Sequence, residues 1–385
     1  MKRRDFLKTS AVAACAVLAP QFALAQAAGG YRNLLLLVEL KGGNDGLNTV
    51  VPYADPSYYA LRPRIAIRRD DVLPLDARTG LHPSLAPLVP LWKARELAIV
   101  QGVGYANPNL SHFRSIEVWE TASKSEEYLS DGWLARAFAA HPVPRSFAAD
   151  GVIVGSNDLG PLAGTGARAV ALANTEQFLR QAKLAQPMQV AQGNRALAHL
   201  LKVESDVAQA ASGLQGRHAF RTEFPQGPFG QAVRSAAQVV ASNAGVAAVR
   251  LSLDGFDTHQ NQPAPHASLL RQLAEGLAAL RSALVELERW DSSLVLTYAE
   301  FGRRAQENGS NGTDHGTANV HFALGGRVKG GILGAAPRLD RLENGNLVHA
   351  VEFRSLYATV LERWWGVPSS GVLGGRFPAL DLLKA

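Results

Sequence analysis

The feature that most constrains the fold is a nearly continuous apolar run close to the start of the chain. It reads YRNLLLLVEL at residues 31–40 and ends in the glycine-rich segment KGGNDG at 41–46. A run of this length is too short to span a membrane as a helix. It is typical of a strand that is buried on both faces, and the glycines predict a tight turn after it. Strands of this kind occur in parallel sheets that helices cover on both sides.

Further strand-like apolar runs alternate with helical patterns along the chain. The expected strands lie at 96–103, 152–154, 169–172, 246–253, 293–298 and 320–324, and the expected helices at 85–93, 111–123, 229–244, 265–289 and 352–365. This alternation predicts an α/β fold with a mainly parallel sheet sandwiched by helices. The segment 175–214 is rich in Ala, Gln and Leu and indicates two more helices, so we expect a helical insert over about 175–244. A ligand site of such a fold lies beyond the carboxyl ends of the strands.

Residues 1–25 have the three parts of an export signal: a basic start, a mildly apolar middle and the small-residue end ALA, with cleavage expected before Gln26. RRDFLK at 3–8 resembles the twin-arginine signal, which implies export of a folded protein by the twin-arginine translocase to the periplasm. The alternatives are an ordinary secretory signal or a lipid anchor at Cys15. Pro20 interrupts the apolar stretch, and we expect no stable membrane span after the signal is removed.

The remaining chain, 26–385, is expected to be one domain with the helical insert. Its chemistry is restricted by the position of the single cysteine, Cys15, inside the signal. Disulfides, cysteine zinc sites and thiolate catalysis are therefore excluded for the mature protein. The formal net charge of +6 comes partly from the signal. No Lys/Arg tract follows, so we expect no nucleic-acid partner.

Acidic and imidazole side chains follow or flank several of the expected strands. Because loops at the carboxyl ends of parallel strands converge, we expect these side chains to meet. They are Asp45, Asp257, His259, Glu300, Asp314 and His315. Carboxylates and imidazoles without cysteine suit one or two divalent ions such as Zn²⁺, Mn²⁺ or Ca²⁺. Each residue also has an ordinary alternative: a turn or capped loop for the aspartates and their histidines, and an ion pair with Arg303 or Arg304 for Glu300.

Ser111 and His112 begin the helix expected at 111–123. Ser111 is either a simple helix cap or a nucleophile, since the start of a helix favours an anion. His112 is either a metal ligand or proton donor, or a surface histidine. His266, near the start of the helix expected at 265–289, is a second-rank ligand candidate.

Four segments together resemble the DUF1501 family of exported bacterial proteins, over nearly the whole mature length. They read LLLLVELKGGNDGLNTVVPY (34–53), LSHFRSIEVWETAS (110–123), GFDTHQNQ (255–262) and LTYAEFGRRAQENGSNGTDHGTANVHFALGG (296–326). This resemblance implies membership of the alkaline phosphatase-like superfamily, whose members use two divalent metals and a nucleophile at the start of a helix.

The resemblance also implies roles for single residues. It makes Asp45 the first metal carboxylate and Ser111 the nucleophile. Asp257 would bind metal with either His259 or His266, because the spacing differs from the superfamily pattern. Glu300 would replace a metal carboxylate, while Phe301 stands where a metal histidine is expected.

His315 would be the last metal histidine, with Asp314 supporting the ligands. A simpler alignment makes Asp314 and His315 the superfamily's Asp-His pair itself. The missing histidine at 301 leaves one metal site weakened, completed by His112, or lost.

The sequence therefore favours an exported metal-dependent hydrolase of small anionic phospho- or sulfo-esters. Asp45 and Glu300 would hold one ion with Ser111, and the second ion would be held by Asp257, His259 and His315. Arg114 and Arg303 are candidate anion clamps. The alternative is a non-catalytic exported protein that binds a ligand or partner through a degenerate metal site.

Overall fold

The computed structural model describes residues 30–172 and 218–384. The expected export signal and the segment 175–214 lie outside this part of the chain, so these two expectations stay predictions. Of the expected insert, the described part includes helix α10 (Pro228–Ala241), which packs directly on the main sheet. Within the described residues, no helix combines the length and the apolar character needed to cross a bilayer.

A nine-stranded sheet forms the centre of the molecule, with the strand order β11-β5-β10-β9-β1-β8-β6-β7 and β12 paired with β5. The strands are β1 (Leu34–Lys41), β5 (Leu97–Gly104), β6 (Ala149–Val154), β7 (Ala169–Leu172), β8 (Val246–Asp254), β9 (Ser293–Tyr298), β10 (Asn319–Leu324), β11 (Gly331–Leu333) and β12 (Val351–Glu352). All neighbours are parallel except β10, which is antiparallel to β5 and β9. The predicted mainly parallel sheet is confirmed.

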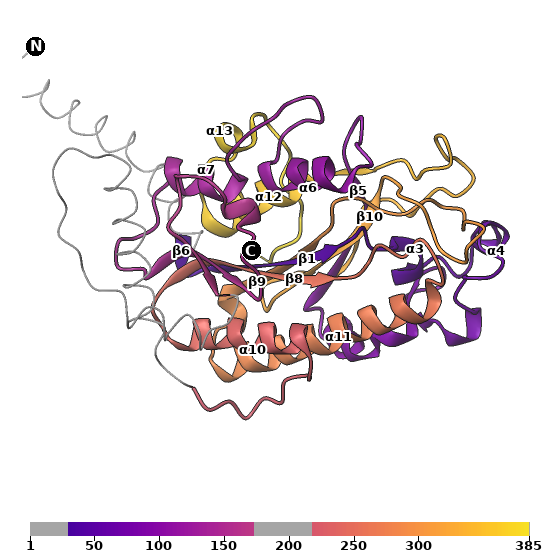
Figure 1. Ribbon diagram of the computed structural model, residues 1–385. Coiled ribbons are helices and arrows are strands. Elements are labelled where there is room, and N and C mark those ends of the chain that lie inside the picture. Colours follow the sequence, from indigo (N-terminus) through magenta and orange to yellow (C-terminus); the bar gives the residue numbers. More distant parts are fainter. Residues whose placement is uncertain (1–29, 173–217, 385) are drawn as a thin grey trace, which may run out of the picture.

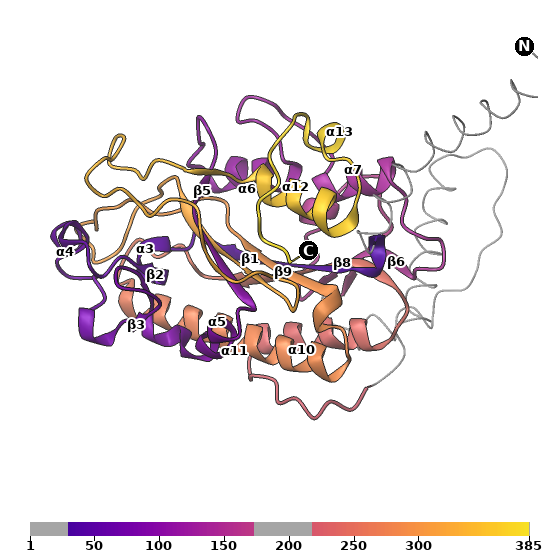
Figure 2. The same ribbon diagram turned by 180° about the vertical axis from the view of Figure 1, so that it is seen from behind.

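Helices cover both faces of this sheet (Figures 1 and 2). One face carries α10 and α11 (Pro263–Glu286), and the other carries α6 (His112–Thr121), α7 (Trp133–Ala140), α12 (Arg354–Ala358) and α13 (Ser370–Leu373). Strand β1 shows why both faces must be covered: Leu36 and Val38 join the core under α10 and α11, while Leu35 and Leu37 join the opposite core. The continuous apolar run is thus the signature of a strand buried on two sides.

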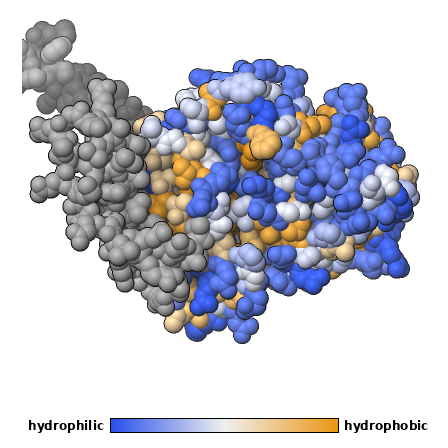
Figure 3. All heavy atoms as spheres, viewed as in Figure 1, coloured by the Kyte–Doolittle hydropathy of each residue, from blue (hydrophilic) through white to orange (hydrophobic). Residues whose placement is uncertain are grey.

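The remaining elements are short. They are α3 (Gly46–Thr49), α4 (Pro56–Leu61), α5 (Val89–Lys93), a small sheet of β2 (Val50–Val51), β3 (Leu73–Pro74) and β4 (Gly80–Leu81), a π-helical stretch at Thr359–Trp365, and 3₁₀ turns at Gly30–Arg32, Arg69–Asp71, Pro83–Leu88, Gly160–Leu162 and Trp290–Ser292. The outer surface is largely hydrophilic, with hydrophobic side chains in small patches on the face that Figure 3 shows.

The antiparallel direction of β10 has a local cause. The connection from β9 to β10, residues 299–318, contains no helix. A parallel neighbour would need a crossover, usually helical, whereas an antiparallel strand can return directly. As a result, the residues just before β10 lie at the same edge as the carboxyl ends of β1, β5, β8 and β9.

A buried ionic cluster supports the sheet beneath this edge. Arg250 of β8 is 1% exposed, and its Nη2 lies 2.6 Å from Glu39 Oε2, 3.2 Å from Glu120 Oε1 and 3.3 Å from Asp158 Oδ2. One guanidinium thus forms ion pairs with three carboxylates. Burial raises the pKa of Glu120 to about 8; Arg250 opposes this rise, and the charges of Asp158 and Glu39 add to it.

The raised pKa of Glu120 predicts that ionisation of this side chain destabilises the fold at high pH. A glutamine at this position, which does not ionise, would remove that destabilisation. An exposed glutamate ionises near pH 4.5, so the unfolded state loses the Glu120 proton earlier than the folded state does, and the fold is destabilised as pH rises from about 5 to about 8. We expect Glu120→Gln to exceed the wild type in free energy of unfolding by on the order of 2 kcal/mol at pH 8.5, and by much less at pH 5. Urea unfolding at the two pH values checks this. A gain that does not change with pH would contradict it, and Glu117→Gln on the same helix is the control.

Candidate metal centre

Polar side chains from four separate segments meet at the carboxyl edge of the sheet. His112 is the first residue of α6, which follows β5, and Asp257 follows β8. Glu300 follows β9, and His315 precedes the antiparallel β10. Residues that lie up to 203 positions apart in the sequence, from 112 to 315, are therefore neighbours in space.

Three imidazoles converge on the carboxylate of Asp257. Its Oδ1 lies 3.1 Å from His259 Nε2 and 3.2 Å from His315 Nε2, and its Oδ2 lies 3.4 Å from His112 Nε2. The Nε2 atoms of His259 and His315 are 2.9 Å apart. Among the described residues, His112, Asp257 and His315 are the one group of three or more such side chains whose ligand atoms all lie within 4.8 Å of one another.

The other nitrogen of each ring has an oxygen partner. His112 Nδ1 lies 2.8 Å from Glu300 Oε1, His315 Nδ1 lies 2.8 Å from the backbone oxygen of Leu110, and His259 Nδ1 lies 3.2 Å from Asp314 Oδ1. A carbonyl or carboxylate oxygen only accepts, so each Nδ1 donates to its partner, and in a neutral ring the lone pair is then on the Nε2 that faces Asp257.

This arrangement fits a divalent cation. Nitrogen lone pairs and a carboxylate that face one another repel; Arg303 offsets part of this repulsion from behind Asp257, and a cation among the Nε2 atoms would offset the rest. Metal-bound histidines typically donate their second N–H to a carboxylate or a backbone carbonyl, which is the pattern of all three rings here. Three imidazoles and one carboxylate are a donor set typical of Zn²⁺ or another first-row transition metal rather than of Ca²⁺.

Arg303 sits behind the carboxylate of Asp257 and holds it ionised. Its Nη2 donates to Asp257 Oδ1 at 2.7 Å, and the rest of its guanidinium donates to the backbone oxygens of Gly43 and Thr313 at 2.7 and 2.9 Å. Burial alone would raise the pKa of Asp257, but the hydrogen bond and the positive charge of Arg303 lower it to about 2. The expectation that Arg303 clamps an anion is wrong, because its donors are occupied inside the protein.

Arg114 is likewise occupied. Its guanidinium donates to the backbone oxygens of Lys124, Ser125 and Glu127 and stacks on the Tyr128 ring, with 3.9 Å between Cζ and the ring centroid. The arginine therefore fastens the loop after α6 and is not available as a clamp.

Phe301 forms an apolar wall beside the imidazoles. Its ring centroid lies 4.4 Å from that of His315 and 4.9 Å from that of His112. Gly43 has a positive φ of 76°, and a Cβ there would lie 2.4 Å from the Phe301 ring. The glycine-rich turn after β1 thus allows the aromatic ring to pack closely, and His112 comes from another segment to contribute an imidazole next to it.

Asp45 belongs to a different, buried network. Its Oδ2 lies 2.6 Å from Arg62 Nη1 and also accepts from Gln262, while Oδ1 accepts from the backbone N–H of Leu47 at the start of α3. Glu300 instead contacts His112 and accepts from the backbone N–H of Gly42 at 2.8 Å. The expected pairing of Asp45 with Glu300 around a first ion is therefore not found, because Arg62 supplies the positive charge next to Asp45.

His259 and His266 differ in their contacts. His259 faces Asp257 and His315, whereas His266 is fully buried with its Nε2 2.9 Å from Asn44 Oδ1. Burial lowers the pKa of His266 to about 4. His266 is thus a neutral core residue in the network around Asp45 and not part of the cluster at Asp257.

Ser111 occupies the N-cap position of α6, but its side chain makes no capping hydrogen bond. The residue is exposed, and its backbone N–H donates to Asn109 Oδ1 at 2.8 Å. Its two neighbours, Leu110 and His112, both contact the cluster through the atoms described above. The hydroxyl of Ser111 therefore does not accept a backbone N–H of α6, as the hydroxyl of an ordinary helix cap would.

Glu300 should strengthen metal binding through His112 without touching the ion. It is 2% exposed and directs its charge at His112 Nδ1, which raises the basicity of the ring. We expect Glu300→Gln to weaken metal affinity by about 10- to 100-fold. Competition with a chromogenic chelator measures the affinity. Unchanged affinity would show that Glu300 only supports the fold, and the matched control is Glu117→Gln, since Glu117 lies on α6 and pairs with Arg114 at 2.8 Å and not with the cluster.

Comparisons with known proteins give one family match and several structures of limited similarity. No curated protein matches the sequence. Similar solved structures include the C-terminal periplasmic domain of EcEptC from Escherichia coli in complex with zinc, which is 8% identical, with 76% of this chain and 72% of that chain covered and a TM-score of 0.35. The lipoteichoic acid synthase LtaP from Listeria monocytogenes is 10% identical, with coverage of 90% and 75% and a TM-score of 0.38. The PsFucS1 sulfatase from Pseudoalteromonas sp. is 11% identical, with coverage of 91% and 70% and a TM-score of 0.41.

These likenesses are too distant to carry an argument about activity. The family match does carry a conclusion, because residues 98–366, more than half of the chain, fit the model described as a protein of unknown function (DUF1501). That range includes α6, β8, β9 and β10, and with them every residue of the cluster around Asp257. The chain belongs to the DUF1501 family.

Proposed function

We propose that this protein is an exported, metal-dependent hydrolase of small phospho- or sulfo-esters, with one divalent ion held by His112, Asp257, His259 and His315. The observation that carries the proposal is the convergence of three Nε2 atoms on Asp257, each ring being anchored through Nδ1. Zn²⁺ and Mn²⁺ are the favoured ions. Glu300 and Asp314 orient the ligands in this proposal, and Asp45 supports the turn after β1.

The ion would supply Lewis-acid polarisation of an ester oxygen when bound. The chain itself offers the N-terminus of α6, whose first backbone N–H groups and helix dipole favour a phosphate or sulfate group. Phe301 and the buried Arg303 shield one side of the cluster from water. An anionic ester would thus lie between the start of α6 and the imidazoles.

Ser111 is the proposed nucleophile. Its Oγ would form a bond to phosphorus or sulfur and lose its proton as the bond from that atom to the leaving oxygen breaks, and this proton would pass to the leaving oxygen, which departs as the alcohol. Water would then cleave the new serine ester, which releases phosphate or sulfate and restores the hydroxyl. The absence of a capping bond at Ser111 supports this role.

Export through the twin-arginine route to the periplasm is part of the proposal and rests on the sequence of residues 1–25. A folded metalloprotein without structural cysteines suits such a route. The second candidate is a non-catalytic exported protein that binds a ligand or partner. It is favoured by the single ligand cluster among the described residues and by Phe301 in place of an expected histidine.

A panel of aryl phosphates, phosphodiesters and aryl sulfates, each with added Zn²⁺, Mn²⁺ or Ca²⁺, tests the proposed activity. We expect one ester class to be hydrolysed with about one tightly bound ion per chain, and the rate to vanish with a chelator and return with Zn²⁺ or Mn²⁺. One ion per chain without hydrolysis of any ester would favour the non-catalytic reading. A protein that binds no metal would contradict the hydrolase and favour the non-catalytic candidate.

A further inference from the structure

A second hollow lies apart from the metal centre. Its volume is about 320 Å³, and it is lined by the first residues of β10, by Gln101 and Gly102 of β5, and by the segments around Val50 and Val348. None of the four residues that surround the candidate metal position lines it. A ligand of the hollow is therefore not the ester proposed above.

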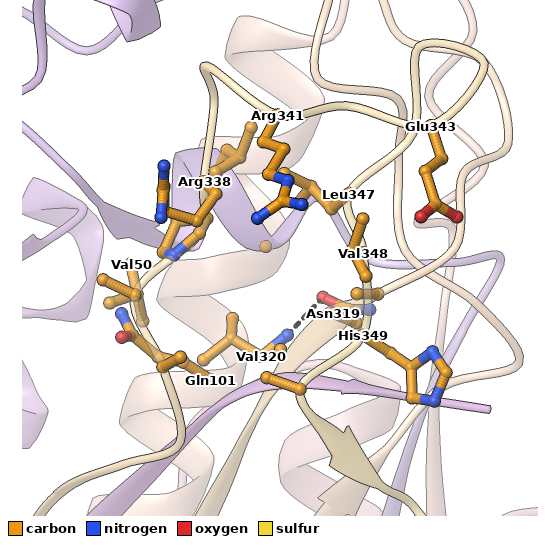
Figure 4. A pocket seen from close by; sticks show the side chains of 18 residues that line it. Val50, Gln101, Asn319, Val320, Arg338, Arg341, Glu343, Leu347, Val348 and His349 are labelled. Atoms are coloured by element: carbon orange, nitrogen blue, oxygen red, sulfur yellow. Dashed lines mark hydrogen bonds between the residues drawn. The ribbon is translucent and has the colours of Figure 1, made fainter. Parts of the chain in front are cut away.

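Most of the lining is apolar. Leu47, Val50, Val320, Leu347 and Val348 contribute side chains, together with several alanines (Figure 4). An apolar cavity of about 150 Å³ holds one benzene ring. A hollow of roughly twice that volume accommodates a body about the size of naphthalene.

The floor carries a polar group without a partner. Gln101 is only 4% exposed, and its carboxamide, whose polar atoms still reach solvent, makes no hydrogen bond to any residue in the described part of the chain. Asn319, the neighbouring amide, is by contrast fully used: it donates to the backbone oxygen of Phe301 at 3.0 Å and accepts from the N–H of Val320 at 2.8 Å. A buried amide gains from a hydrogen bond that a bound molecule would supply.

The rim carries an unpaired positive charge. Arg338 forms an ion pair with Asp340 at 2.7 Å, whereas the guanidinium of Arg341 makes no ion pair or hydrogen bond to any described residue. Figure 4 shows the guanidinium of Arg341 turned toward the middle of the lining. The hollow thus combines an apolar body, a cationic end and a separate amide.

We propose that this hollow binds a small organic acid with a flat apolar body, a carboxylate that pairs with Arg341 and a hydroxyl that reaches Gln101. Charge-assisted hydrogen bonds from arginine to a carboxylate are the strongest contacts this lining offers. The hydroxyl adds a smaller preference, because it satisfies an amide that is otherwise left without a partner.

Calorimetric titration of the purified, metal-loaded protein with 6-hydroxy-2-naphthoate tests the proposal. We expect one molecule to bind per chain and Arg341→Gln to weaken binding by about tenfold or more. The same variant should leave the binding of uncharged 2-naphthol unchanged. Arg271→Gln, which removes an exposed arginine from α11, is the matched control and should have no effect.

Two further variants test whether the ligand binds in this hollow and not at the metal centre or elsewhere on the surface. Gln101→Leu should abolish the preference for 6-hydroxy-2-naphthoate over 2-naphthoate, and Val348→Trp, at a half-exposed rim position, should fill the hollow and abolish binding. Metal content in Val348→Trp should stay at the wild-type level. Binding that persists in Val348→Trp, that ignores Arg341→Gln, or that never saturates would overturn the proposal.

Discussion

Replacing His315 with alanine should cost the protein its metal. The Nε2 of His315 lies 3.2 Å from Asp257 Oδ1 and 2.9 Å from His259 Nε2, so its removal takes away one of the four ligand atoms and leaves an open side. Loss of an outer-shell partner alone typically weakens metal binding 10- to 100-fold. We expect loss of a ligand to exceed this, with an affinity at least about 100-fold lower and no detectable ester hydrolysis.

Elemental analysis after dialysis and competition with a chelator measure the effect. His141→Ala is the control, because His141 lies after α7, away from the cluster. Far-ultraviolet circular dichroism separates metal loss from unfolding. Wild-type metal content and affinity in His315→Ala would show that the cluster around Asp257 is not the metal site.

The sheet could be predicted because its sequence signal is physical and local. A strand buried on two faces must be apolar at every position, and Leu34 to Val38 satisfy this in sequence and in structure. The pattern does not specify strand direction, so it gave no sign that β10 runs antiparallel. That direction depends on the helix-free connection before it, and it brings His315 to the carboxyl edge of the sheet.

The candidate site was predictable in its location but not in its partners. Asp257 and His315 follow from the rule that polar loops gather at strand ends. Asp45 satisfies the same rule, yet Arg62 reaches it from a helix end that carries no sequence signal, and the ion pair is 2.6 Å long. Proximity at a sheet edge therefore does not determine which charges become metal ligands and which become buried ion pairs.

His112 is the opposite case, because it lies in the cluster although its sequence position did not distinguish it. Its position at a helix start is equally typical of a surface histidine, and completing the site that lacks a histidine at 301 was one of three alternatives; no pattern in the sequence pairs it with Glu300, 188 positions away. The contact is created only when β5 and β9 take their places on either side of β10. Predicting this contact would require evidence that positions 112 and 300 vary together among related proteins. A single sequence does not contain such evidence.

Ser111→Ala should separate chemistry from metal binding. The hydroxyl is the proposed nucleophile, so we expect ester hydrolysis to fall by about a thousandfold or more, as is typical when an enzyme loses its nucleophile. Metal content and affinity should stay at wild-type values, because Ser111 is not among the ligand atoms around Asp257. Steady-state kinetics on the ester class found with the substrate panel, together with elemental analysis, tests both expectations.

Protein stability distinguishes a nucleophile from a helix cap at this position. An ordinary N-cap serine that is replaced by alanine costs about 1 kcal/mol of stability, because a backbone N–H loses its acceptor. Ser111 makes no such bond, so we expect the free energy of unfolding to change by less than about 0.5 kcal/mol. Ser130→Ala, at another exposed serine, is the control for both measurements. A fully active Ser111→Ala protein would exclude the serine ester and leave direct attack by water, whereas a variant that loses about 1 kcal/mol and no activity would identify Ser111 as a cap. Loss of turnover with unchanged stability and metal content is the one combination that the proposed mechanism requires.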